Sequence, residues 1–173
     1  MRETVWFVED KHHFAEGAFA LLTLLMAFYL FFLFSYSSFG IVAPAWPLMT
    51  LLYWRRKWPK FSNLGLFWFV GLLLDLSSQA VLGGYALSLL LVYCFASQMQ
   101  KSRVISKNMY VESFFVLLMV FIFQSVYLVI QWSVGTLHFS FFYFTQTLLS
   151  ALLWPWFVVF LQFFHRFFKK VTR

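Results

Sequence analysis

Charged residues and cysteine are what this sequence has least of. Only 11% of its 173 residues are charged, whereas 62% are hydrophobic. An average soluble domain carries about 25% charged residues, so this chain lacks the polar side chains that a water-exposed surface requires. The shortage of charge excludes an ordinary soluble fold and indicates that the lipid bilayer surrounds most of the chain.

The single cysteine, Cys94, excludes an intrachain disulfide, a zinc site built from cysteines and a thiol redox pair. Its apolar neighbours predict a small buried side chain. The four histidines are dispersed, and the Gly83-Gly84 pair is not followed by the Lys and Ser or Thr of a phosphate-binding loop. The sequence therefore predicts no enzyme, no catalytic residue, no cofactor and no metal site.

Apolar runs follow one another along the whole chain. A bilayer core of about 30 Å requires roughly 20 apolar residues in a helix. We predict an all-α transmembrane helical bundle that forms one domain over residues 1–173, with about six spans. Their approximate bounds are 17–37, 39–54, 64–82, 85–98, 111–132 and 139–164. The second and fourth runs are short. Because Pro44 and Pro47 remove amide donors, we expect the second segment to be kinked, partly re-entrant or dependent on neighbouring helices to satisfy its backbone.

The basic residues are segregated. All 13 Lys and Arg residues lie at the termini, in the loop after the second run or in the loop after the fourth. Because basic loops stay in the cytoplasm, we predict that both termini and these loops are cytoplasmic. The loop residues are Arg55, Arg56, Lys57, Lys60, Lys101, Arg103 and Lys107. Clusters between apolar runs argue against nucleic acid as a partner and favour contact with anionic membrane lipids.

Asp75 is the only carboxylate well inside a predicted span. An acid in the bilayer costs about 3 kcal/mol even on permissive scales, so Asp75 needs partners. Helical spacing places Gly71, Ser78 and Gln79 on the same face, where the small residue permits close helix approach. Two interpretations have equal weight: a site for a partner, substrate or proton, and an internal hydrogen bond that fixes the packing of the bundle.

Other polar residues have simpler interpretations. Gln124 in the fifth run, and Gln146 and Ser150 in the sixth, are typical of hydrogen bonds between membrane helices. Glu112 lies at the predicted start of the fifth helix, where an acid suits the helix dipole. None of these residues requires a special role.

Two segments resemble the family of the bacterial rod shape-determining protein MreD. The first, PAWPLMTLLYW, precedes a basic loop and contains Pro44, Trp46, Pro47, Tyr53 and Trp54. The second, GLLLDLSSQAVLGGYAL, contains Gly71, Asp75 and Gly83. The length, the six apolar runs and the basic loops also fit that family.

The resemblance implies an inner-membrane, non-catalytic component of the machinery that directs lateral peptidoglycan synthesis and maintains rod shape. The implied partners are MreC and, in the wider complex, MreB, RodA and a class B penicillin-binding protein. From the residues, we expect Gly71, Asp75 and the bent second helix to form a groove for a partner's single transmembrane helix.

Two alternatives remain open. The resemblance also implies a bundle similar to the substrate-binding subunits of vitamin transporters, so the alternative is a membrane subunit that binds a small molecule. An ion-coupled carrier using Asp75 is the weakest candidate, because there is one intramembrane acid and no evident inverted repeat.

Overall fold

The structure, a computed structural model, describes residues 3–35, 44–59, 62–78, 82–101, 109–135 and 143–171. In this part of the chain there are six α-helices and no strand, which confirms the predicted fold class. The helices are α1 (Glu3–Ser35), α2 (Trp46–Lys57), α3 (Leu64–Ser78), α4 (Gly84–Lys101), α5 (Met109–Val134) and α6 (Tyr143–Val171).

Three of these helices are long and apolar enough to cross a membrane. The crossing segments are Gly17–Phe34 in α1, Tyr110–Val134 in α5 and Phe144–Phe167 in α6. The shorter apolar helices are α3 and α4, and α2 has only 12 residues, or about 18 Å at 1.5 Å per residue. Each of the six predicted runs thus corresponds to a helix, but in the described residues only three have the length and composition of a complete span.

The short helix α2 occupies the centre of the bundle. Every residue from Pro47 to Trp54 is buried, so α2 is covered around its whole circumference. It contacts α1, α4, α5 and α6. A helix that is apolar and buried on all sides is the innermost element of a membrane bundle, and here it carries much of the core.

The two prolines of this segment lie before α2 and in its first turn, so α2 has no proline kink, and its start depends on a neighbouring helix as one of the three expectations stated. Pro44 precedes the helix, and Pro47 lies in its first turn, where the missing amide hydrogen has no partner in any case. The Ala45 amide just before the helix donates to Ser150 Oγ of α6 at 3.0 Å. Proline therefore starts α2 and leaves it straight. Residues 39–43 of the predicted span lie outside the described residues.

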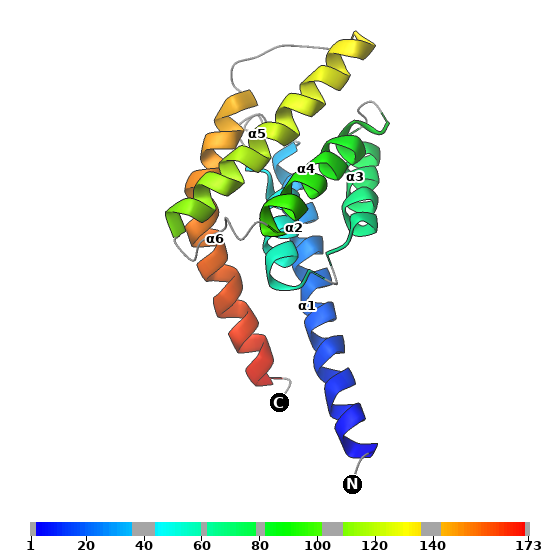
Figure 1. Cartoon of the computed structure of the whole chain (residues 1–173), viewed down its shortest axis with the longest axis vertical. Coiled ribbons are helices and arrows are strands. Elements are labelled where there is room, and N and C mark those ends of the chain that lie inside the picture. The colour runs from blue at the N-terminus through cyan, green and yellow to red at the C-terminus, as the bar shows by residue number, and fades with distance from the viewer. Residues whose placement is uncertain are drawn as a thin grey trace.

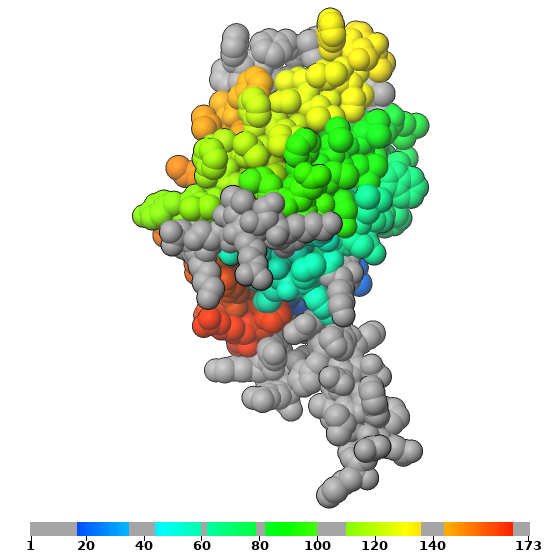
Figure 2. Space-filling view, in the orientation of Figure 1, coloured from blue at the N-terminus to red at the C-terminus, as the bar shows by residue number. Residues whose placement is uncertain are grey.

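The start of α1 and the end of α6 lie at the same end of the molecule (Figure 1). The end of α3 and the start of α4 lie at the opposite end. Figure 2 shows α3, α4 and α5 side by side on one face, in agreement with the contacts between these neighbours. The cytoplasmic location of the two termini stays a prediction from their charge.

Candidate functional site

Asp75 holds the start of α4 with its carboxylate. The residue is only 1% exposed. Its Oδ1 accepts a hydrogen bond from the Tyr85 amide at 2.8 Å, and its Oδ2 accepts from the Gly83 and Ala86 amides at 3.0 and 3.2 Å. The first amides of a helix lack partners within the helix and form the positive end of its dipole. Asp75 is therefore an N-terminal cap that α3 supplies to α4.

Glycine permits this arrangement at two positions. A Cβ atom at Gly71 would lie 2.9 Å from the backbone nitrogen of Ala86, closer than side chains allow. Gly83 has a φ of +93°, which glycine adopts without strain. The Gly71 face, which we expected to receive a partner's helix, is therefore occupied by α4 of the same chain.

The rest of this polar face is also used locally. The Ser78 hydroxyl donates to the Leu74 carbonyl, one turn back in α3, at 2.7 Å. Gln79 lies outside the described residues. Of the two interpretations of Asp75, the internal hydrogen bonds are present in the structure. A role toward a partner, substrate or proton stays a prediction.

The tryptophan-rich segment builds the centre of the bundle. Trp54 is 1% exposed, and its Nε1 donates to Thr23 Oγ1 of α1 at 2.8 Å. Its ring packs edge-on against Phe19, with the centroids 5.9 Å apart. The other members of the predicted segment lie close by: Pro44, Pro47 and Tyr53 are buried, Trp46 is half-buried and Gly83 forms the turn before α4.

An apolar groove of about 710 Å³ lies between α1 and α6. Side chains between Phe19 and Leu30 form one wall, side chains between Leu153 and Phe164 form the other, and α2 forms the floor with Trp46 and Thr50. The Thr50 hydroxyl is satisfied by the Trp46 carbonyl at 2.9 Å. The Trp46 indole Nε1, in contrast, is buried and has no hydrogen-bond acceptor.

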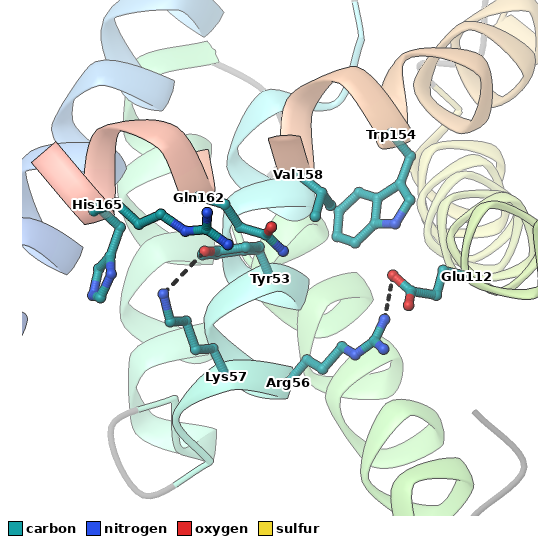
Figure 3. Close-up of a pocket in the computed structure, with 9 residues that line it drawn as sticks. Tyr53, Arg56, Lys57, Glu112, Trp154, Val158, Gln162 and His165 are labelled. Atoms are coloured by element: carbon teal, nitrogen blue, oxygen red, sulfur yellow. Dashed lines mark hydrogen bonds and ion pairs between the residues drawn. The ribbon is translucent and has the colours of Figure 1, made fainter. Parts of the chain in front are cut away.

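A second cavity, of about 460 Å³, is lined by cationic and polar side chains from α2, α5 and α6 (Figure 3). The lining residues are Tyr53, Arg56, Lys57, Glu112, Trp154, Val158, Gln162, His165 and Arg166. We call this cavity the basic pocket. On α6 its lining residues lie between Trp154 and Arg166, in the C-terminal part of that helix.

Two polar contacts fix the α2 side of the basic pocket. The Arg56 guanidinium forms an ion pair with Glu112, which is 8% exposed, and so joins α2 to α5. Lys57 Nζ donates to the Tyr53 hydroxyl at 3.3 Å. Sequence reasoning placed Glu112 at a helix start but missed its partner. The spacing of Tyr53, Arg56 and Lys57, at i, i+3 and i+4, was the available sign that they share a face.

The remaining predicted residues have separate positions. Arg55 does not line the basic pocket: it donates to the Ser62 carbonyl at 2.9 Å, and its guanidinium lies 4.5 Å from the centroid of the Tyr93 ring. The side chain of Lys101 lies outside the described residues, as do Lys60, Arg103 and Lys107. The structure therefore brings Arg56 and Lys57 together in the basic pocket, and Arg55 lines another, smaller cavity with Arg56 and Glu112.

Hydrogen bonds between α5 and α6 confirm the interpretation of their polar residues. Gln124 Nε2 donates to Gln146 Oε1 at 2.8 Å, and the Thr147 hydroxyl bonds Gln124 Oε1. Cys94 is exposed on the surface of the bundle, so the prediction that it is buried is wrong. Among the described residues, no group of three His, Cys, Asp or Glu side chains is placed to hold a metal ion.

An all-helical bundle with several membrane-crossing helices defines a multi-pass membrane protein. The sequence profile of the rod shape-determining protein MreD matches residues 13–164, and the chain belongs to this family. It is 32% identical over 122 residues to the rod shape-determining protein MreD of Haemophilus influenzae, across 69% of this chain and 73% of that protein. No solved structure matches the chain. It is thus a rod shape-determining membrane protein.

Proposed function

We propose that this protein is a non-catalytic scaffold of the cell-elongation machinery in the bacterial inner membrane, and that it holds the single transmembrane helix of an MreC-like partner between α1 and α6. The observation that carries this proposal is the apolar groove of about 710 Å³. In the proposal the protein acts by binding, and MreB, RodA and a class B penicillin-binding protein join through the wider complex.

The walls of the groove suit a helix. They extend from Phe19 to Leu30 on α1 and from Leu153 to Phe164 on α6, about 16 Å along each axis at 1.5 Å per residue. Thr23, Ala27 and Thr50 are the small residues of the lining. Small side chains allow two membrane helices to approach closely, and apolar walls supply the packing that holds them together.

The groove also offers one polar contact. The Trp46 indole is a buried donor without an acceptor, which is costly in apolar surroundings. A hydroxyl or carbonyl of a partner helix that enters the groove would supply the acceptor after a small shift of the ring. This groove replaces the one that we expected at Gly71 and Asp75, and it keeps α2 as part of the binding surface.

A matched pair of valine substitutions tests the groove. Val159 lines it and is 52% exposed, whereas Val129 lies on α5, is 60% exposed and is not among the groove's lining residues. We expect Val159→Trp to reduce co-purification of the MreC-like partner by about tenfold, since overpacking costs 1–3 kcal/mol. Cells that depend on this variant should become wider and round. Val129→Trp should leave both readouts unchanged.

Two outcomes would contradict the proposal. Full partner binding and rod shape with Val159→Trp, in protein that remains folded, would place the partner's helix elsewhere. Co-purification of ATPase subunits or a bound vitamin, with normal cell shape after depletion, would favour the transporter subunit instead.

A further inference from the structure

The basic pocket is separate from the groove and is not used by the proposed function. Its α6 residues Trp154, Val158 and Gln162 follow one another at intervals of four, so they form a single stripe on that helix. The α6 residues of the groove, such as Phe157 and Phe160, occupy a different face. An occupant of the basic pocket and a helix in the groove can therefore be bound at the same time.

The charges of the pocket favour an anion. Arg56, Lys57 and Arg166 are cationic at neutral pH, and Glu112 is the one carboxylate among the described lining residues. The Arg56 and Glu112 charges offset each other in their ion pair. The described lining residues thus carry three positive charges and one negative charge, and the Tyr53 hydroxyl lies beside the Lys57 ammonium (Figure 3).

The character of the pocket changes along α6. Trp154 and Val158 form an apolar part, and Gln162, His165 and Arg166 form a polar part. Trp154 and Arg166 are about 18 Å apart along the helix axis at 1.5 Å per residue. The apolar part lies deeper within the apolar stretch of α6, and the cationic part lies at its end. A lipid headgroup with the start of its chain has the same sequence of polar and apolar groups.

The deep part of the pocket has one unmet donor. Trp154 is 3% exposed, and its Nε1 has no hydrogen-bond acceptor. A buried donor of this kind is destabilising unless a ligand or water supplies an oxygen. A lipid ester or phosphate oxygen beside the indole would serve after a small shift of the ring.

We propose that the basic pocket binds a phosphate group, and its graded walls favour one carried by an anionic membrane lipid. Lys57 and Arg166 bind the phosphate oxygens, Tyr53 and Gln162 contribute hydrogen-bonding groups, and Trp154 and Val158 contact the apolar part of the lipid. The volume of about 460 Å³ is within the roughly 300–1,000 Å³ of small-molecule sites.

The test uses the full chain purified in mild detergent and mixed with equal amounts of phosphatidylglycerol and phosphatidylcholine, with bound lipid measured by native mass spectrometry. We expect preferential retention of phosphatidylglycerol. Arg166→Gln and Lys57→Gln should each weaken this retention about fivefold, the factor expected for one basic residue at an anionic membrane surface. Arg166 is exposed, so its substitution should not affect folding.

Arg55→Gln is the matched control, because it removes the same charge from the same helix at a residue that faces Tyr93. It should leave phosphatidylglycerol retention unchanged. Inorganic phosphate, added as a competitor, separates the two sources of the group. Displacement of the lipid by millimolar phosphate supports a site for free phosphate, and retention of the lipid supports a headgroup site.

Three results would overturn the proposal. The first is equal retention of the two lipids by the unmodified protein. The second is a loss with Arg166→Gln and Lys57→Gln no larger than that with Arg55→Gln. The third is binding of an acidic peptide that displaces the lipid while phosphate does not, which would assign the pocket to a protein partner.

Discussion

The α3–α4 hairpin is closely packed, whereas the groove between α1 and α6 is open. In the hairpin, Asp75 satisfies three backbone amides and Gly71 brings the two helices into direct backbone contact. In the groove, α1 and α6 form the two walls over a floor from α2, and Trp46 has a donor without an acceptor. The closed region satisfies its polar groups within the chain, and the open region is the one that a second molecule can complete.

This difference between the two regions indicates a structural role for the intramembrane acid Asp75. A carboxylate inside a bilayer is a functional candidate by default. Here the Asp75 carboxylate accepts hydrogen bonds from three amides at the start of the next helix, so its burial is explained by helix capping. The open groove, lined by ordinary apolar residues and two threonines, is the better place to look for a partner.

The largest effect should come from Gly71. Gly71→Ala puts a Cβ atom against the Ala86 backbone, which cannot move without separating α3 from α4. We expect a loss of about 3 kcal/mol of stability, measured as thermal unfolding in detergent. Gly65→Ala is the control on the same helix, because its Cβ would meet only Asn63 Oδ1 at 3.6 Å. Equal behaviour of the two variants would mean that the hairpin is not closely packed.

Asp75→Ala should have the next largest effect. It leaves the amides of Gly83, Tyr85 and Ala86 without their acceptor in apolar surroundings, for an expected loss of about 2 kcal/mol. Ser77→Ala, which removes only bonds to carbonyls of its own helix, serves as the control and should change stability little. If Asp75→Ala is stable but no longer binds the MreC-like partner, the acid has a role outside the hairpin.

The smallest expected effect is the difference in stability between phenylalanine variants of the two tryptophans of α2. Trp54→Phe removes the hydrogen bond to Thr23 and should cost about 1 kcal/mol beyond the change in ring size. Trp46→Phe removes a donor that has no acceptor, so the isolated protein should be as stable as the original or slightly more stable. The same Trp46→Phe variant should bind the MreC-like partner more weakly. A stability loss equal to that of Trp54→Phe would show that the Trp46 donor is satisfied in the isolated protein.

The helices could be predicted from the sequence because long apolar runs leave few other structures in a bilayer. Their lengths were less predictable. α1 begins at Glu3, in a charged segment that has no apolar signal. α2 begins at Trp46, later than the predicted residue 39, because Pro47 lies in its first turn. A hydropathy pattern locates a helix, but it does not say whether that helix crosses the bilayer or lies enclosed by the others.

The sites were less predictable than the helices, for a physical reason. The partners of Asp75 are backbone amides, which have no signature in a sequence. Arg56 and Glu112 are 56 positions apart in number and meet only because α2 and α5 pack together. The groove forms where α1 and α6, at the two ends of the chain, lie against α2, and only the assembled bundle shows this.

The enclosure of α2 has a consequence for how the protein is made. Twelve residues are too few to cross a bilayer alone, and α2 also carries three basic residues in its last turn. During synthesis, α2 emerges long before α6, whose Ser150 satisfies the Ala45 amide. Until α6 is inserted, α2 therefore stays at the membrane without the α6 residues that cover it and bond to the residue that precedes it. A chain cut short before α6 would expose that helix to the quality-control proteases of the cell.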